Sequence, residues 1–261
     1  MGILNLSADS FFTGSRVESS EMLESRAERM LRDGAEILDL GALSSRPGSA
    51  EISVADEISL LIPGLKKLRD EFPRILISVD VFRPEVAKAA LEEGADTINH
   101  IQGTRICDRM LEIIADAGAA CILMHSRGSF SEMHQNTDYP EMLSSVASEL
   151  AFAIHRARQA GVKDVVADPG FGFSKNPDQN YALFRGMNYL QQMLSCPLLA
   201  GISRKSMIYK KLNCSAEEAL NGTTALHMAA LMQGVHILRV HDVKEAAETI
   251  QLFQELCLQE S

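Results

Sequence analysis

One stretch decides how the chain is interpreted: Val165-Val166-Ala167-Asp168-Pro169-Gly170-Phe171-Gly172-Phe173-Ser174-Lys175. Its first half is apolar and stops abruptly at a carboxylate, as expected for a buried strand that ends at Asp168. Its second half is a loop rich in glycine, which lets the backbone approach a ligand closely. A simple Asp-Pro-Gly turn after a core strand has the same composition. The way in which the other strands end therefore decides between a turn and a functional loop.

The same unit, an apolar run followed by a helical pattern, recurs along the chain. Strands are predicted near residues 2–7, 37–41, 75–80, 96–99, 120–125, 164–168, 197–203 and 237–241. Helices are predicted near 19–32, 54–68, from Pro84, and near 107–117, 141–160, 178–193, 216–233 and 242–253. Eight buried strands, each followed by an amphipathic helix, predict an α/β fold, a TIM (β/α)8 barrel in a single domain over residues 1–261. A doubly wound sheet is the alternative, but eight units in this length favour a barrel.

Composition and charge exclude several classes of protein. Of the 261 residues, 46% are hydrophobic and 23% are charged, which is ordinary for a chain with a packed core. A net charge of −10 without a Lys/Arg run argues against nucleic acid as a partner. No apolar run approaches the length of a membrane span, so no membrane association is expected. Five scattered cysteines favour a reducing, cytoplasmic compartment over a disulfide framework or a zinc site.

Polar and charged residues gather at the ends of the predicted strands, which form the functional face of a barrel. These ends carry, in chain order, Asn5, Asp39, Asp80, Asn99, Met124, His125, Asp168, Ser203, Arg204, Lys205, Arg239 and His241. Any one of them can be a buried polar group with an ordinary partner. As a set they divide the mouth in two. The acids and amides suit a heterocycle with adjacent N–H groups, and the cations after the last two strands suit an anion such as phosphate.

A family resemblance rests on sequence blocks that follow the same order. They are Met1-Gly-Ile-Leu-Asn5, Asp9-Ser10-Phe11, Asp39-Leu40-Gly41, Ser45-Arg46-Pro47-Gly48, Ile77-Ser78-Val79-Asp80, Ile98-Asn99, Met124-His125, Asp168-Pro-Gly-Phe-Gly-Phe-Ser-Lys175, Ser203-Arg204-Lys205-Ser206 and Arg239-Val240-His241-Asp242. With these blocks the chain resembles the dihydropteroate synthases over essentially its full length. Each block alone is weak, but their combination in this order on eight strand–helix units is specific.

The resemblance implies a transferase of folate biosynthesis. Such an enzyme condenses 6-hydroxymethyl-7,8-dihydropterin diphosphate with 4-aminobenzoate and releases 7,8-dihydropteroate and pyrophosphate. The partners are therefore small molecules, and Mg²⁺ is the implied cofactor. The family resemblance further implies a homodimer and a pocket that sulfonamide drugs target.

Individual residues also take roles by this resemblance. The pterin would be bound by Asp80, Asn99, Met124, Asp168 and Lys205. The diphosphate would be bound by Asn5, Arg239 and His241, with Asn5 as a metal ligand. The aminobenzoate site would include Ser45, Arg46, Pro47, Phe173 and Ser206. Catalytic roles would fall to Asp9, Arg46 and Lys205. The role of Lys175 is left open, because it can equally be a solvated loop cation.

Several positions depart from the usual pattern of the family. Ala8 stands where proline is usual, which removes a constraint on the backbone. Leu43 replaces a carboxylate, and Ser174 replaces a glycine. His100 replaces the aspartate after Asn99, so that a hydrogen-bond acceptor becomes a group that can also donate. We expect these changes to tune substrate affinity and sulfonamide response, because the residues assigned to the pterin and the diphosphate are intact.

Two other functions stay open on the sequence alone. A methyltetrahydrofolate-dependent methyltransferase would share the pterin-binding acids, but it has no use for a diphosphate side. A non-catalytic paralogue that binds pterins or partners would fit the departures at Leu43 and His100. Release of pyrophosphate that depends on both substrates and Mg²⁺ distinguishes the synthase from both.

Overall fold

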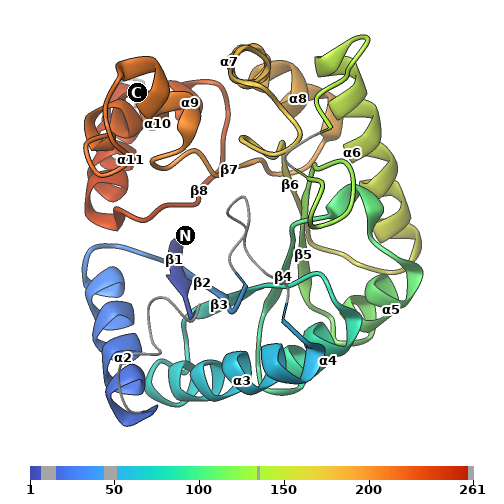
Figure 1. The fold of residues 1–261 in the computed structure, drawn as a ribbon, viewed down its shortest axis with the longest axis vertical. Coiled ribbons are helices and arrows are strands. Elements are labelled where there is room, and N and C mark those ends of the chain that lie inside the picture. Colours follow the sequence, from blue (N-terminus) through green and yellow to red (C-terminus); the bar gives the residue numbers. More distant parts are fainter. Residues whose placement is uncertain (7–15, 44–51, 134–135, 258–261) are drawn as a thin grey trace.

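The computed structural model describes residues 1–6, 16–43, 52–133 and 136–257. In these segments, parallel strands alternate with helices, and the helices form a ring outside the strands (Figure 1). The strands are β1 (Gly2–Asn5), β2 (Ile37–Gly41), β3 (Leu76–Asp80), β4 (Thr97–His100), β5 (Ala120–Met124), β6 (Val165–Asp168), β7 (Leu199–Ala200) and β8 (Ile237–Leu238). The helices are α2 (Arg16–Arg32), α3 (Val54–Glu71), α4 (Pro84–Glu92), the short 3-10 helix η1 (Gly103–Arg105), α5 (Asp108–Asp116), α6 (Met142–Gln159), α7 (Pro177–Arg185), α8 (Met187–Leu194), α9 (Ser206–Leu212), α10 (Leu220–Met232) and α11 (Val243–Cys257).

The strands follow the order of the predicted barrel, but the described strands do not form one unbroken ladder. β1 to β6 make a six-stranded parallel sheet in sequence order, and β7 pairs with β8 in a separate two-stranded sheet. Single bridges, Ala167 to Leu198 and Gly2 to Val240, link the two sheets. The main-chain N–H of Val240 donates to Met1 O over 2.9 Å, which sets β8 beside β1. The TIM-barrel fold class is confirmed, whereas the barrel is not closed by continuous ladders.

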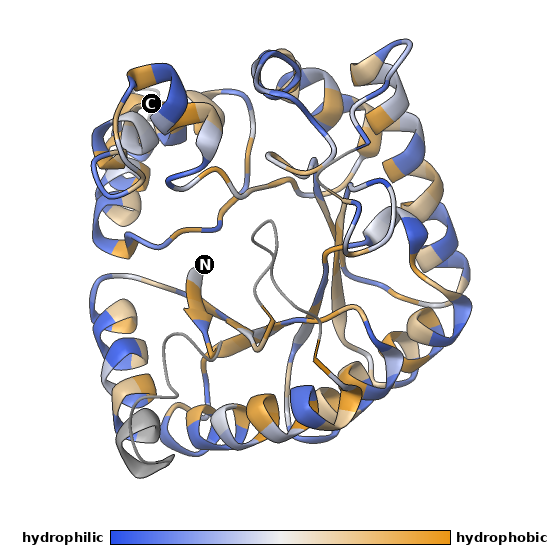
Figure 2. Cartoon of the chain, viewed as in Figure 1, coloured by the Kyte–Doolittle hydropathy of each residue, from blue (hydrophilic) through white to orange (hydrophobic). Residues whose placement is uncertain are grey.

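The core lies between the strands and the inner faces of the helices. Strand residues such as Leu38, Val79 and Ile98 are fully buried. Figure 2 shows the apolar positions of the helices turned toward the strands and the polar positions turned outward. Burial of one such Leu or Ile side chain is worth roughly 1.5–3 kcal/mol. In the described residues, no helix combines the length and the apolar character required to cross a membrane.

The C-terminal third differs most from the sequence-based expectation. The helix predicted over 178–193 is divided into α7 and α8 at Gly186, whose N–H caps α7 through the carbonyls of Ala182 and Leu183. Helix α9 occupies a segment where no helix was predicted. The two last strands are shorter than the apolar runs that predict them. Pro197, in the first of those runs, has no N–H to donate and serves only as an acceptor for Ala167 N.

Buried histidines make the stability of the fold sensitive to acid. Burial lowers the pKa of His100, His125, His227 and His241 to about 4, from an ordinary value of 6.5. Between these two values the unfolded chain binds more protons than the folded chain. The free energy of unfolding therefore falls as pH falls through this window, by up to roughly 1.4 kcal/mol per pH unit for each histidine.

His227→Leu is expected to make the free energy of unfolding depend less steeply on pH in this acidic range. The Nε2 of His227 is buried without a hydrogen-bond partner among the described residues, so the imidazole contributes little to stability and stays neutral in the folded state down to about pH 4. The free energy of unfolding is measured in urea at about pH 4.5, 5.5 and 6.5. Its slope against pH should be lower in the variant than in the wild type by up to roughly 1.4 kcal/mol per pH unit. Parallel pH profiles for the variant and the wild type would contradict the prediction.

Candidate active site

Asp39 organises the acidic side of the mouth. Its side chain is fully buried in β2, where Asp39 pairs with Ser78 two residues before the ends of β2 and β3. One carboxylate oxygen accepts Ser78 Oγ–H over 2.6 Å, and the other accepts Asn99 Nδ2–H over 3.1 Å. A buried carboxylate with several donors is a rigid anchor, because each donor offsets part of its desolvation cost. The sequence placed Asp39 at this edge but gave it no role.

Arg239 joins the last strand to this acidic side. Its Nε donates to Asp39 Oδ2 over 2.6 Å, and its Nη2 donates to Asp80 Oδ2 over 2.9 Å. Burial opposes the charge of the guanidinium, but the two carboxylates outweigh it and raise the pKa of Arg239. Burial raises the pKa of Asp80 to about 7, although Arg239 works in the opposite direction. Asp80 can therefore gain or lose a proton near neutral pH.

Asp168 and Lys205 form a second pair of opposite charges. Burial raises the pKa of Asp168 and lowers that of Lys205 to about 8, and each group partly offsets the shift of the other. Asp168 Oδ1 accepts Gly170 N–H over 2.8 Å. A side chain at Gly201 would place its Cβ 3.8 Å from Asp168 Oδ2 and 3.9 Å from Lys205 Nζ. Because Gly201 has no side chain, the space next to both Asp168 and Lys205 stays open.

An apolar wall borders these charges. It is a cluster separate from the main core and contains Ile101, Met124, Phe130, Met133 and Phe173, with Phe82 packed against it. The rings of Phe82 and Phe130 stack with centroids 5.1 Å apart. Lys205 Nζ lies 4.5 Å from the centroid of Phe173 and donates to the main-chain oxygen of Phe171. Met124 and Phe173, which were predicted for different substrates, therefore line one continuous surface.

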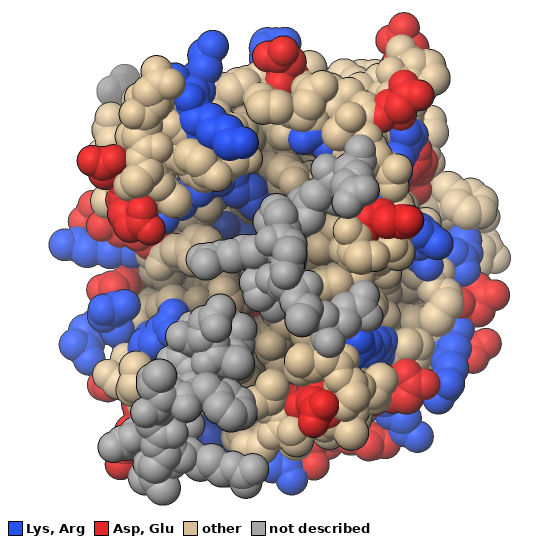
Figure 3. Space-filling model, viewed as in Figure 1, with Lys and Arg blue, Asp and Glu red and all other residues tan. Residues whose placement is uncertain are grey.

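The cationic side is smaller than the sequence indicated. Lys and Arg side chains gather near β7 and β8 in the view of Figure 3, but Arg204 is already used. Its guanidinium forms two hydrogen bonds to Asp242, of 2.7 and 2.9 Å, so the expectation that it binds an anion is not supported. His241 Nδ1 lies 3.3 Å from Ser203 Oγ, and burial together with Arg239 lowers the pKa of His241 to about 4. His241 is therefore neutral at pH 7.

Asn5 and Asp80 flank Gly41 at the ends of the first three strands. A Cβ at Gly41 would lie 3.7 Å from Asn5 Oδ1 and 3.4 Å from the Cβ of Asp80. Ser206 is the first residue of α9 and is half-buried. The structure thus brings Asn5, Asp80, Asn99, Met124, Asp168, Phe173, Lys205, Ser206, Arg239 and His241 to one end of the strands. The predicted residues Asp9, Ser45, Arg46 and Pro47 lie outside the described residues.

Two sequence-based interpretations change. Lys175 is not a solvated loop cation, because it is 6% exposed and its ammonium group is hydrogen-bonded on all sides. His100 does not contact Asn99 through its ring. Its Nδ1 accepts Gln102 N–H over 3.2 Å, and its side chain leaves the strand on the face opposite to Asn99. The effect expected of His100 on Asn99 therefore has no direct contact to carry it.

Gly170→Ala is expected to destabilise the loop after β6 severely. The φ angle of Gly170 is +71°, and an added Cβ would lie 1.9 Å from the main-chain oxygen of His125. Gly118→Ala is a matched control, because Gly118 has a φ of +65° but no atom within 4 Å of the added Cβ. We expect a loss of about 1 kcal/mol in the control and about 4 kcal/mol at Gly170, measured by urea unfolding. Equal losses would show that the overlap with His125 is easily relieved.

The fold and the site together define the class: a TIM-barrel enzyme with buried acids, an amide, an apolar wall and cations at the C-terminal ends of its strands. A family profile described as pterin binding enzyme matches residues 1–241. The dihydropteroate synthase of Escherichia coli (strain K12) is 38% identical over 256 residues, which covers 97% of this chain and 90% of the relative.

Solved structures agree with this likeness. Dihydropteroate synthase from Thermus thermophilus in complex with 4-aminobenzoate superposes with a TM-score of 0.87 at 36% identity, over 98% of this chain and 93% of that one. The enzyme from the same organism in complex with 6HMPPP gives a TM-score of 0.83 at 34% identity, with the same coverage. The Yersinia pestis enzyme in complex with a sulfonamide drug gives 0.90 at 34% identity, over 98% and 93% of the two chains. The chain belongs to the dihydropteroate synthase family of pterin-binding enzymes.

Proposed function

We propose that this protein condenses 6-hydroxymethyl-7,8-dihydropterin diphosphate with 4-aminobenzoate. The bond between the pterin methylene carbon and the diphosphate oxygen breaks, and pyrophosphate leaves with the bonding electrons. The amine nitrogen forms the new bond to that carbon and loses a proton, which gives 7,8-dihydropteroate. Cleavage ahead of attack would suit this site, because buried carboxylates favour positive charge on the pterin methylene carbon.

The observation that carries the proposal is the pairing of charges around one mouth. Asp168 faces Lys205, and Asp80 is paired with Arg239, beside an apolar wall that contains Met124. A carboxylate accepts two parallel hydrogen bonds, which matches the edge of a pterin ring, and a thioether packs well on an aromatic face. Lys205 and Arg239, the cations of this mouth, would suit a departing diphosphate. Correct placement of the amine would then lower much of the barrier.

Arg239 can bind the diphosphate without releasing its carboxylate partners. Its bonds to Asp39 and Asp80 use two of the five N–H groups of the guanidinium, so a diphosphate oxygen can accept from the others. Asp80 bonds to Arg239 through Oδ2 and could accept a pterin N–H with its other oxygen, with Asn99 beside it. Asp39 would keep Nε in place, because the Asp39 carboxylate is fully buried. Binding of the two halves of the substrate would thus be coupled through one guanidinium.

Mg²⁺ fits this site as a companion of the substrate. The described residues contain no group of three His, Cys, Asp or Glu side chains that could hold a metal by itself. Asn5 offers one carboxamide oxygen at the strand ends, and Mg²⁺ commonly takes one or two protein oxygens together with phosphates and water. When bound, the ion would neutralise charge on the leaving pyrophosphate. His241, which is neutral, would contribute a hydrogen bond and not a charge.

The arylamine would bind beside Phe173, Lys205 and Ser206. Lys205 Nζ is held 4.5 Å from the centroid of the Phe173 ring, so a flat carboxylated ring placed there would meet both an aromatic face and a cation. Ser45, Arg46 and Pro47 are proposed to complete this pocket, and Asp9 and Arg46 to act in catalysis. Their assignment rests on the family resemblance. Sulfonamide drugs are proposed to bind in the same pocket.

A homodimer in the cytoplasm is part of the proposal. Met232 at the end of α10 and Leu252 and Leu256 on α11 are 69%, 62% and 72% exposed, which is typical of a surface that a second copy covers. All five cysteines are free, as expected in a reducing compartment. The chain is proposed to be a single domain over residues 1–261.

One assay tests the function. Pyrophosphate release is measured with both substrates and Mg²⁺, then with each component left out in turn, and 7,8-dihydropteroate is identified by mass. We expect release only in the complete mixture, and complete loss with EDTA that excess Mg²⁺ restores. Pterin binding without release under any condition would favour the non-catalytic paralogue. Transfer of a methyl group from methyltetrahydrofolate would favour the methyltransferase.

A further inference from the structure

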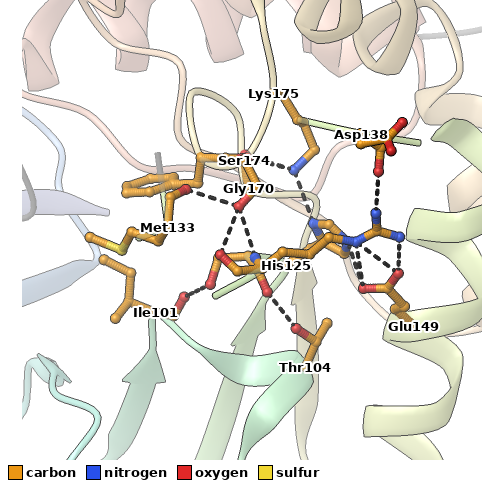
Figure 4. A network of polar contacts seen from close by, with 12 residues as sticks. Ile101, Thr104, His125, Met133, Asp138, Glu149, Gly170, Ser174 and Lys175 are labelled. Atoms are coloured by element: carbon orange, nitrogen blue, oxygen red, sulfur yellow. Dashed lines mark hydrogen bonds and ion pairs between the residues drawn. The ribbon is translucent and has the colours of Figure 1, made fainter. Parts of the chain in front are cut away.

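The loop after β6 is folded around a buried lysine (Figure 4). The ammonium of Lys175 donates to Gly170 O over 3.1 Å and to Phe173 O over 3.0 Å, both within its own loop. Its third hydrogen bond, of 3.0 Å, goes to His125 Nδ1 at the end of β5. Three donors therefore meet three acceptors, and burial lowers the pKa of Lys175 to about 7. Nothing in the proposed chemistry uses this group.

The bonds continue from His125 to the outer helix α6. Since Lys175 donates to Nδ1, the proton of the neutral imidazole lies on Nε2, which donates to Glu149 Oε2 over 3.1 Å. Burial opposes the charge of Glu149, but its bonds to His125 and Arg127 lower its pKa to about 2. The Glu149 carboxylate is therefore ionised. Its negative charge balances the Lys175 ammonium, to which it is linked through the His125 ring. The whole chain of bonds has one consistent arrangement of protons.

Ser174 ties the same loop to the segment after β5. It has a φ of +51°, a conformation that favours glycine, and yet its side chain is fully buried. Its hydroxyl accepts Arg127 N–H over 2.8 Å and lies 2.9 Å from Met133 O as a donor. A glycine would adopt the same φ but could not make these bonds. Ser174 thus anchors the turn to the segment after β5, and Lys175 joins the end of the turn to Gly170, with Phe171 and Phe173 between them.

We propose that Lys175 is a positioning residue for the condensation, which sets the Phe171 carbonyl and the Phe173 ring against Lys205. This inference rests on the proposed function of the site. Lys205 meets the loop through its bond to Phe171 O and its approach to the Phe173 ring. If Lys175 were absent, the carbonyls of Gly170 and Phe173 would lose a buried cationic donor and the turn would relax. Lys205 would then lose its alignment with the arylamine.

The two substrates should respond differently to the loss of Lys175. The three hydrogen bonds of Lys175 go to His125, Gly170 and Phe173 and not to Asp168. The other pterin-side groups, Asp80 and Asn99, are held by Arg239 and Asp39. Binding of the pterin should therefore be largely retained. The arylamine side depends on the Phe173 ring, whose carbonyl bonds directly to Lys175. Weaker binding of the arylamine alone would indicate a positioning role for Lys175. General destabilisation would instead reduce the fraction of active protein and would affect both substrates equally.

Lys175→Met tests the proposal in the full-length protein. We expect the KM for 4-aminobenzoate to rise roughly tenfold, as for the loss of one or two charge-assisted hydrogen bonds. The Kd for the pterin diphosphate, measured by calorimetry, should change by less than about threefold, as for loss of contacts on one side only. Lys163→Met is the matched control, since Lys163 is exposed at the other end of β6 and should leave both constants unchanged.

A second variant covers the case in which Lys175→Met does not fold. Lys175→Ala with added ethylammonium can replace the lost donor in the cavity, and we expect partial recovery of the KM for 4-aminobenzoate. An unchanged KM in folded Lys175→Met, or equal weakening of both substrates, would overturn the proposal. So would the absence of any rescue in Lys175→Ala. If the wild type itself releases no pyrophosphate, the proposed function fails instead, and the two failures are distinguishable.

Discussion

Asp168→Asn is expected to lower kcat/KM for the pterin diphosphate by roughly a thousandfold, the cost of one charge-assisted pair and one misplaced donor. The carboxylate can accept two parallel N–H bonds from a pterin edge, whereas a carboxamide accepts one and presents its own N–H to the other. The fold should survive, because the amide oxygen can still accept Gly170 N–H. Burial raises the pKa of Asp168, so removal of the charge also removes a desolvation cost.

Steady-state pyrophosphate release measures the turnover of this variant, and calorimetry measures its pterin affinity. Asp164→Asn is the control, because Asp164 is exposed just before β6 and its main-chain oxygen is engaged by Cys121 N–H, which the substitution leaves in place. Both proteins should unfold at similar urea concentrations. Intact turnover together with normal pterin binding in Asp168→Asn would show that Asp168 does not bind the N–H groups of the pterin edge.

Arg239→Met is expected to lower the free energy of unfolding by about 3–5 kcal/mol and to abolish turnover. The guanidinium is the cationic partner of both Asp39 and Asp80, which would otherwise lie close together in the buried mouth. Removing one member of a buried ionic cluster leaves charges that neither water nor protein compensates. Exposed pairs behave differently: Arg32→Met, which breaks the surface pair of Arg32 with Glu28, should cost about 0–1 kcal/mol.

The pH dependence of the Arg239→Met defect identifies its cause. The pKa of Asp80 is already raised to about 7 by burial, and Arg239 is the group that holds it down. In the variant this pKa rises further, so the folded state gains a proton that the unfolded chain lacks at neutral pH. The stability deficit should therefore grow as pH rises above about 7, where Asp80 loses its proton in the wild type but keeps it in the variant. A deficit that stays constant from about pH 6 to about pH 9 in urea unfolding would point to lost packing and not to unpaired charge.

The sequence predicted those parts of the site that local pattern controls. Asp80, Asn99 and Asp168 were found because each ends an apolar run, and the carboxyl ends of parallel strands meet at one edge. Pro84 correctly marked the start of α4, because its ring suits the first turn of a helix. The break at Gly186 and the helix α9 were missed. Neither carries a periodicity long enough to distinguish it from its surroundings.

Side-chain partners were beyond the reach of the sequence. Arg204 and Arg239 look alike as basic residues after the last two strands, but one is paired with Asp242 and the other with Asp39 and Asp80. The sequence left the role of Lys175 open, because a cation in a loop with Pro and Gly can equally be solvated. The burial of Lys175 depends on carbonyls that turn inward only when the loop after β6 packs on the end of β5.

The chain by itself determined the alternation of strands and helices, the residues that end each strand, and the family to which it belongs. These follow from hydrophobic periodicity and from short motifs, which are local properties. The tertiary structure alone decided that Asp168 faces Lys205 across Gly201, that Asp39 anchors Arg239, and that Lys175 is enclosed by its own loop. The physical reason is that pairing of buried charges depends on distances between segments far apart in sequence, and only folding sets those distances.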